Sequence, residues 1–164
     1  MYAYAHLNQY EKVIENSNRL LEIDSSNLSA LTYRANAYLK LGQNNNALDS
    51  VEKAIKVDPE DSYNLRVYAE VLIRFERYEE AEKCITKALN NDEMACNVLI
   101  LQAIIDLFKD QTETAYKHIE QALNRNVKQI SIKLFKDIAF DKIRNEEKFK
   151  DLFEKIKVDK SRKK

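Results

Sequence analysis

Apolar and small side chains return at helical spacing along the chain, and the pattern is clearest between residues 28 and 61. The first half of this stretch predicts one helix, whose apolar face is formed by Leu31, Ala35, Tyr38 and Leu39. The second half predicts another helix, whose face is formed by Ala47, Leu48, Val51, Ala54 and Ile55. The stretch therefore reads as two amphipathic helices joined by a short connection.

The residues between these helical patterns are ones that end and begin helices. Gly42 can end the first helix in a left-handed cap, because glycine carries no Cβ to oppose that conformation. Asp58 and Pro59 close the unit. We expect Asp58 to cap the following helix and Pro59 to take its first position.

The same two-helix unit recurs with a period of 34 residues. Alanine recurs where two helices must approach closely, since a methyl group permits a short distance between helix axes. Other columns of the repeat hold leucine or isoleucine, and one recurring connection holds Asp or Asn. The columns are Ala35, Ala69, Ala103; Ala47, Ala81, Ala115; Ala54, Ala88, Ala122; Leu31, Leu65, Leu99; Leu21, Ile55, Leu89, Leu123; and Asp24, Asp58, Asp92, Asn126.

These columns resemble the tetratricopeptide repeat. The resemblance rests on Leu31, Ala35, Tyr38, Gly42, Ala47, Ala54 and Pro59 and their 34-residue period. It implies an all-α fold, a right-handed α-α superhelix of stacked helical hairpins. The chain departs from the family pattern at two recurring positions. The aromatic residue that opens the second helix is kept at Tyr10 and Tyr78 but replaced by Asn44 and Thr112, and the turn glycine of Gly42 is replaced by Asn8, Glu76 and Asp110.

We predict a single array over residues 1–164. It begins with a partial repeat at 1–27, continues with full repeats at 28–61, 62–95 and 96–129, and ends with divergent capping helices at 130–164. Only about two helical turns precede the helix that starts near Tyr10, so part of the first repeat is expected to lie uncovered. Either the chain is a piece of a longer array, or this end packs on another copy and gives a homo-oligomer.

Composition removes several classes of function. Lys and Arg number 27 and Asp and Glu number 27, and a net charge of zero disfavours nucleic acid and acidic membrane as partners. The single Gly and single Pro exclude glycine-rich phosphate loops and make a sheet protein untenable. No apolar run is long enough to cross a bilayer, and the start lacks a secretion signal. With two cysteines expected to be buried, Cys84 and Cys96, we predict a cytoplasmic protein.

The chain offers little for catalysis or metal binding. His6 and His118 lie in no metal-ligand spacing, and no serine follows the glycine pattern of a nucleophile elbow. Asp106 interrupts an apolar helix, and we expect it at the solvent edge or paired with a nearby Lys or Arg. We therefore predict no enzyme, no cofactor and no metal site.

The resemblance implies that the first helix of each repeat lines a concave groove. The side chains expected there follow i, i+4, i+8 stripes. In the second stripe the arginines either pair with the intervening glutamate or hold a carboxylate of a ligand. The third, apolar stripe is covered either by the chain's own C-terminal helices or by a partner's apolar anchor. The stripes are Thr32, Asn36, Lys40; Arg66, Glu70, Arg74; and Ile100, Ile104, Phe108, with Tyr2 and His6 extending the set.

We therefore predict a non-enzymatic scaffold that binds a peptide or helix of another protein in this groove. The carboxylate clamp that some members of the family use for heat-shock chaperones is not expected. Thr32 stands where that clamp has a lysine, and Asn97 and Leu101 stand where it has lysine and arginine. The alternatives are an assembly factor or chaperone that shields a client, and a recruiting module cut from a larger protein. Basic residues crowd positions 155–164, which we read as a solvated terminus.

Overall fold

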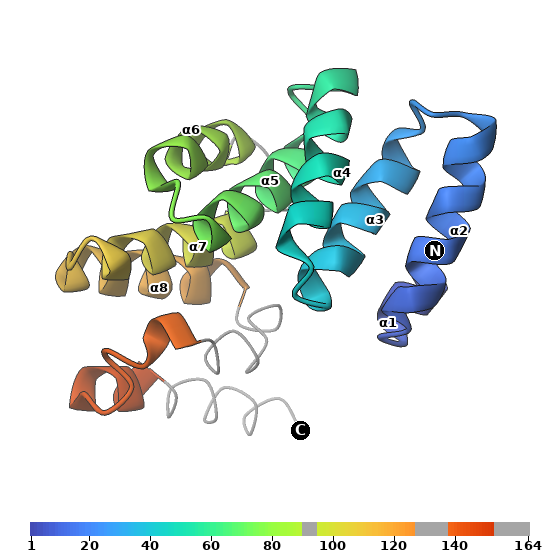
Figure 1. Ribbon diagram of the computed structural model, residues 1–164. Coiled ribbons are helices and arrows are strands. Elements are labelled where there is room, and N and C mark those ends of the chain that lie inside the picture. The colour runs from blue at the N-terminus through green and yellow to red at the C-terminus, as the bar shows by residue number, and fades with distance from the viewer. Residues whose placement is uncertain (90–94, 127–137, 153–164) are drawn as a thin grey trace. The chain divides into compact units, whose positions relative to one another are not determined.

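The computed structural model describes residues 1–89, 95–126 and 138–152 (Figure 1). Helices and turns make up these residues, and none of them lies in a β-strand. The chain divides into two compact units, residues 1–94 and residues 95–164, which are described separately. The predicted all-α fold is confirmed for the described part of the chain.

The first unit is a stack of helical hairpins. Its helices are α1 (Tyr2–His6), α2 (Tyr10–Ile23), α3 (Leu28–Lys40), α4 (Asn44–Val57), α5 (Ser62–Arg74) and α6 (Tyr78–Ala88). Each of the pairs α1–α2, α3–α4 and α5–α6 forms one hairpin, and α3 and α5 pack on the preceding hairpin as well as on their own partner helix. Consecutive hairpins therefore stack side by side, as Figure 1 shows for α3 to α6.

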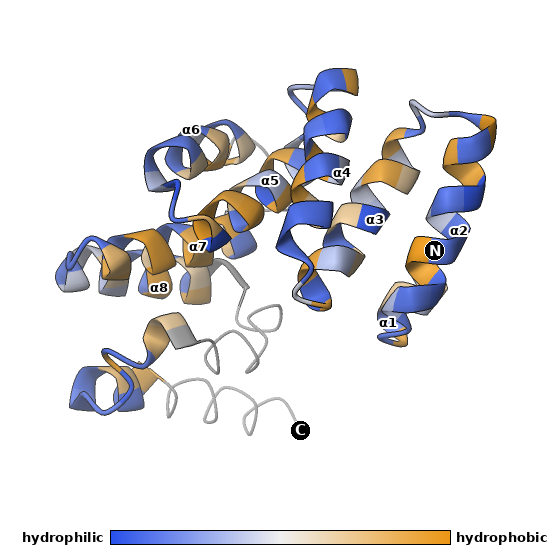
Figure 2. Ribbon diagram, viewed as in Figure 1, coloured by the Kyte–Doolittle hydropathy of each residue, from blue (hydrophilic) through white to orange (hydrophobic). Residues whose placement is uncertain are grey.

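The second unit contains one further hairpin, formed by α7 (Ala95–Phe108) and α8 (Thr112–Asn126). A short 3₁₀ helix, η2 (Ile138–Phe140), packs on α7. Figure 2 shows α7 as hydrophobic along nearly its whole length, which agrees with its apolar sequence. Five apolar residues between 138 and 152 are buried: Ala139, Phe140, Ile143, Phe149 and Leu152. The remainder of the expected capping region, and the basic residues at 155–164, lie outside the described residues.

The recurring alanines lie where the helices pack. All nine members of the three alanine columns are fully buried, with an exposed fraction of 0%. In the first unit, Ala35 and Ala47 pack in one cluster with Val51, Val67 and Val71. Any larger side chain at these positions would push two helices apart, because protein interiors are close-packed.

The connection inside each hairpin has the same backbone geometry in all four hairpins. The second residue after the first helix of each hairpin has a left-handed backbone conformation. These residues are Asn8 (φ 55°), Gly42 (φ 72°), Glu76 (φ 57°) and Asp110 (φ 57°). At Gly42, the N–H donates to the Leu39 carbonyl at 3.1 Å, and the following N–H of Gln43 donates to the Tyr38 carbonyl at 2.9 Å. The same pair of bonds forms at the other three turns. Each first helix thus ends in a Schellman motif, with or without glycine.

The prediction that Asp58 caps the next helix and Pro59 opens it is wrong. Asp58 follows α4, and its carboxylate accepts the N–H groups of Glu60 and Asp61 at 3.0 and 3.1 Å. The cap of α5 is Asp61, whose carboxylate accepts the Asn64 N–H at 2.7 Å. An aspartate that binds N–H groups two and three residues ahead closes a turn, and the chain then needs three more residues to reach the helix.

The first hairpin is shorter than the others, as predicted. Helix α1 spans five residues and buries none of them, whereas α3 spans 13. Large apolar side chains of this hairpin are exposed, namely Tyr2, Leu7, Leu20 and Ile23. Packing of this end on another copy stays a prediction. Among the described residues, no helix has the length and apolar character that crossing a bilayer requires.

Candidate partner-binding surface

Helices α3 and α5 bring four of the predicted groove residues together around one carboxylate. Glu70 accepts from Lys40 Nζ at 3.2 Å across the two helices, and from Arg66 Nη1 at 3.1 Å one turn earlier on α5. Arg74 lies one turn later on the same helix, and its charge also acts on Glu70. We call Lys40, Arg66, Glu70 and Arg74 the Glu70 cluster.

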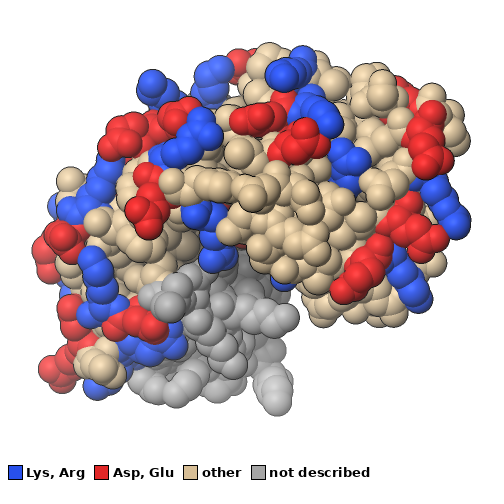
Figure 3. All heavy atoms as spheres, viewed as in Figure 1, with Lys and Arg blue, Asp and Glu red and all other residues tan. Residues whose placement is uncertain are grey.

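The Glu70 cluster carries three cations and one carboxylate. Burial alone would raise the pKa of the Glu70 carboxyl, but the charges of Lys40, Arg66 and Arg74 together hold this pKa below its ordinary value. Glu70 is therefore ionised at neutral pH, and it is one carboxylate among three cations of the described residues. Lys40 and Arg74 are exposed, whereas Arg66 and Glu70 are largely buried. On the face that Figure 3 draws, acidic and basic side chains of the described residues are interspersed.

Asn36 lies next to this cluster through Tyr63. The Asn36 amide donates to the Tyr63 hydroxyl at 3.2 Å, and the Arg66 guanidinium stacks over the Tyr63 ring at 4.8 Å from the ring centre. Tyr63 thus fixes the orientation of Arg66. Two buried atoms at this place, the Oδ1 of Asn36 and the Nε of Arg66, have no hydrogen-bond partner among the residues that the structure describes. Buried polar atoms are seldom left unpaired in proteins.

Thr32, which we expected in the same stripe as Asn36, does not face a groove. It is buried, its hydroxyl donates to the Leu28 carbonyl at 2.8 Å, and it shares a second hydrogen bond with the buried side chain of Asn64. This pair joins α3 to α5 inside the stack. An i, i+4 stripe drifts by about 40° around the helix at each step, because four residues exceed one turn of 3.6. Thr32, at the start of α3, is thus turned away from Lys40 at the end, and it faces Asn64 of α5.

The apolar stripe lies on α7, in the second unit. Ile100 and Ile104 are buried, with exposed fractions of 1% and 5%, whereas Phe108 at the end of the helix is 43% exposed. Of the two alternatives given for this stripe, the burial of the two isoleucines favours cover by the chain itself over cover by a partner's apolar anchor. Of this stripe, only Phe108 stays accessible, and its role in binding stays a prediction.

The expectation for Asp106 is wrong. Its side chain is 3% exposed and does not pair with a lysine or arginine in the described residues. Instead, it pairs with His118 of α8, whose Nδ1 lies 2.6 Å from the carboxylate, and it accepts from the Gln102 amide at 3.3 Å. The otherwise apolar helix α7 tolerates this buried carboxylate because α8, the other helix of the hairpin, supplies a hydrogen-bonding partner.

The described residues provide no metal centre. Among them, no three His, Cys, Asp or Glu side chains lie close enough to hold a metal ion. Cys84 and Cys96 are buried, as predicted, and burial raises the pKa of the Cys84 thiol. His6 packs edge-on against the ring of Tyr2 at 4.3 Å between ring centres.

Tyr63 is the residue of this surface that the sequence analysis missed. The period gave no signal for it, because Ser29 and Asn97 stand at the equivalent positions of the neighbouring repeats. Its spacing did carry a signal. Tyr63 precedes Arg66 by three residues and Glu70 by seven, which places all three on one helical face.

The comparisons with known proteins agree with this architecture. Residues 6–88 match the family model described as anaphase-promoting complex, cyclosome, subunit 3. No curated protein is similar enough to match the chain.

Several solved structures have the same fold at low sequence identity. A crystal structure of MamA is 13% identical, with 98% of this chain and 94% of that chain covered and a TM-score of 0.69. MamA 41-end from Desulfovibrio magneticus RS-1 is 20% identical, with 79% and 73% covered and a TM-score of 0.65. YrrB, described as a TPR protein with an unusual peptide-binding site, is 18% identical, with 94% and 80% covered and a TM-score of 0.62. The chain is thus a tetratricopeptide-repeat protein and belongs to the family described as anaphase-promoting complex, cyclosome, subunit 3.

Proposed function

We propose that this protein is a non-catalytic scaffold, and that the α3–α5 surface binds an acidic segment of a partner protein. The observation that carries the proposal is the exposure of two cations of the Glu70 cluster. Among the described residues, the cluster sets three cations around one carboxylate, and Lys40 and Arg74 are exposed to solvent. A partner carboxylate can reach these two cations while Glu70 stays paired with Arg66.

The surrounding structure favours such binding over a purely internal ion-pair network. Arg66 is held by Glu70 and by the ring of Tyr63, so the guanidinium is already ordered before a ligand arrives. Pre-ordered side chains on rigid helices lower the entropy cost of binding. An arginine also presents paired donors that match the two oxygens of a carboxylate. We expect a dissociation constant on the order of micromolar, as is common for short segments.

The comparisons support a peptide or helix as the class of ligand. The matched family and the similar structures are built from tetratricopeptide repeats, and YrrB is described as having a peptide-binding site. The similar structures share little sequence identity with this chain, so their ligands do not identify its ligand. The proposal of an acidic segment therefore rests on the charge of the Glu70 cluster. Asn36 and Tyr63 lie beside the cluster and are proposed to contact the partner's backbone.

The test is a selection followed by a measured affinity. Peptides that bind the full chain are selected from a random library, and the tightest is titrated by calorimetry against wild type and an Arg66→Ala, Arg74→Ala double variant. We expect the selected peptide to be rich in Asp and Glu, and its affinity to fall at least tenfold in the double variant. The variant removes the exposed guanidinium of Arg74, and without Arg66 the Glu70 carboxylate is left to compete with the peptide for Lys40.

The control is an Arg19→Ala, Lys53→Ala double variant. These exposed cations of α2 and α4 pair with neighbours one turn away, Glu15 and Asp49, and removing them changes the net charge by the same amount. The control should retain its affinity within about twofold. Equal losses in both double variants, or no loss in either, would contradict the proposal. Circular dichroism checks that both variants keep their helices.

A further inference from the structure

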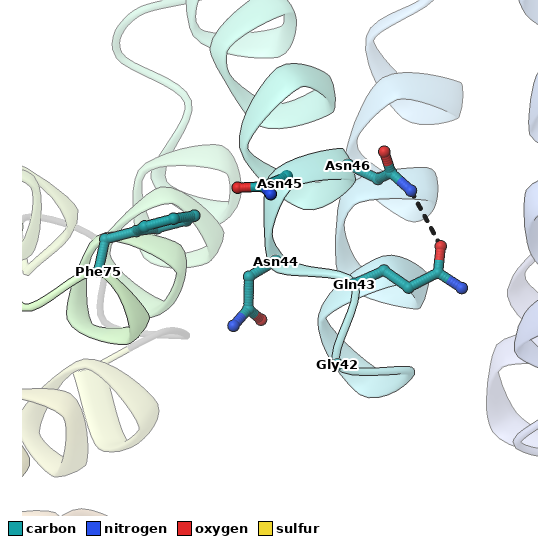
Figure 4. A pocket seen from close by; sticks show the side chains of 6 residues that line it. All are labelled: Gly42, Gln43, Asn44, Asn45, Asn46 and Phe75. Carbon is teal, nitrogen blue, oxygen red and sulfur yellow. Dashed lines mark hydrogen bonds between the residues drawn. The ribbon is translucent and has the colours of Figure 1, made fainter.

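A pocket opens in the first unit between the start of α4 and the end of α5. It has a volume of about 490 Å³ and is lined by Gly42, Gln43, Asn44, Asn45, Asn46 and Phe75. Figure 4 shows the Phe75 ring and the Asn45 amide pointing toward each other across this space. Gln43 and Asn46 pair with each other at 3.0 Å on the far side, as the dashed line shows.

The repeat explains why the pocket exists at this place. Position 44 begins the second helix of its hairpin, and the equivalent positions one repeat earlier and one repeat later hold Tyr10 and Tyr78. Tyr10 is partly buried, and its hydroxyl donates to Asn8 Oδ1 at 2.7 Å in the adjoining turn. Asn44 places a short amide where those repeats place a large ring, so the side chain at this position fills less space.

The lining defines the chemistry of what fits. A third of all residues in this chain are charged, yet none of the six lining residues is. Phe75 packs against the hydrophobic cluster of the first unit, so its ring is held in place as one wall. The amides at the other wall both donate and accept hydrogen bonds. The pocket therefore suits an uncharged group that combines a flat apolar face with a polar tip.

We propose that this pocket accepts an aromatic side chain of a partner protein, with tyrosine as the best fit. The ring would lie against Phe75, where aromatic pairs prefer offset or edge-on contact, and the hydroxyl would bond to the amides of Asn44 or Asn45. A partner tyrosine would thus supply the ring that Tyr10 and Tyr78 supply in the neighbouring repeats. The proposal rests on the proposed function in requiring a protein partner, but it uses no residue of the Glu70 cluster.

The test uses N-acetyl-L-tyrosinamide, an uncharged tyrosine flanked by two amide groups, and follows the side-chain amide signals of the full chain by NMR. We expect saturable shifts at Asn44 and Asn45 and at the Phe75 ring. N-acetyl-L-alaninamide at the same concentration should leave these signals in place. Absence of saturable shifts with the tyrosine probe, or equal shifts with both probes, overturns the assignment.

Two variants locate the site. Asn44→Tyr fills the pocket from within and should abolish the shifts of Asn45 and Phe75, whereas Asn124→Tyr, the same change at an exposed asparagine of α8, should leave them unchanged. Phe75→Leu should weaken binding at least fivefold while the core stays packed, because Leu41 stands at the equivalent position one repeat earlier. Binding that survives both Asn44→Tyr and Phe75→Leu overturns the proposal.

The probe also separates this proposal from the proposed function. The Arg66→Ala, Arg74→Ala double variant should bind N-acetyl-L-tyrosinamide as wild type does. If the acidic peptide fails to bind while the tyrosine probe binds, only the charge-based proposal falls. If the probe fails while the acidic peptide binds, only the pocket proposal falls.

Discussion

Glu76 holds the left-handed backbone conformation that Gly42 holds one repeat earlier, with φ of 57° against 72°. An L-residue in this conformation costs about 1–2 kcal/mol because its Cβ crowds the backbone. Asparagine and aspartate, at Asn8 and Asp110, tolerate it better than glutamate does. The two hydrogen bonds of the Schellman motif hold position 76 in the left-handed conformation, although glutamate disfavours it.

Replacing Glu76 with glycine should therefore stabilise the protein. We expect a gain of about 0.5–1 kcal/mol, since the relief of strain exceeds the added freedom of the unfolded chain. The reverse change, Gly42→Ala, should cost about 1 kcal/mol through the backbone alone, because a Cβ added at Gly42 meets no atom within 4 Å. Urea unfolding midpoints measure both. A lower midpoint for Glu76→Gly would contradict this reading of the turn.

The pair of Asp106 and His118 is the second residue-scale feature with a measurable consequence. The carboxylate is buried, and His118 is its closest partner at 2.6 Å. Removing the imidazole leaves Asp106 with the Gln102 amide at 3.3 Å. A buried charge that loses a hydrogen-bond partner bears the cost of its desolvation.

His118→Ala should destabilise the second unit by about 1–3 kcal/mol. In an Asp106→Asn background, the same change should cost much less, because no buried charge remains to be compensated. A double-mutant cycle read by thermal unfolding gives the coupling. Strictly additive effects would show that the pair contributes nothing beyond its separate contacts.

At the scale of elements, the helices α3 and α5 each begin at a side-chain cap. Asn27 accepts the Ala30 N–H at 3.0 Å to start α3, and Asp61 accepts the Asn64 N–H at 2.7 Å to start α5. The helices α2 and α4 begin differently, since the side chains of their N-cap residues Gln9 and Gln43 make no such bond. The first helices of the second and third hairpins thus have a start signal that α2 and α4 lack.

Asn27→Ala and Asp61→Ala should each cost about 1 kcal/mol of stability, as loss of an N-cap does. Gln9→Ala is the matched control, because Gln9 precedes a helix without bonding to its first turn. It should shift the urea midpoint by less than a third as much as either cap variant. A control loss as large as the cap losses would refute the capping assignment.

The sequence predicted the helices and their packed faces more accurately than it predicted where each helix begins. The alanine columns specified which faces pack, and the structure buries all nine of these alanines. The start of α5 could not be read correctly, because Asp58 and Asp61 are both plausible caps and only the turn at Pro59 decides between them. The column formed by Asn27 and Asp61 carried the correct signal, since these two residues are 34 positions apart.

At the scale of the whole molecule, the 34-residue period continues without a break from Leu21 to Leu123. We therefore propose that residues 1–129 form one array, with 130–164 as its cap. The candidate site was only partly predictable. The i, i+4 spacing placed Arg66, Glu70 and Arg74 together on one helix, but the bond from Lys40 across two helices depends on how the hairpins stack. Burial of Ile100 and Ile104 depends on packing that periodicity does not encode.

The most direct test of the account follows the arginine Nε–H signals of the full chain by NMR while the selected acidic peptide is titrated. Our account predicts that the signals of Arg66 and Arg74 shift and saturate together. Those of Arg19 and Arg77, which pair locally with Glu15 and Glu80, should stay in place. A bound peptide that leaves Arg66 and Arg74 unshifted would contradict the assignment of the α3–α5 surface.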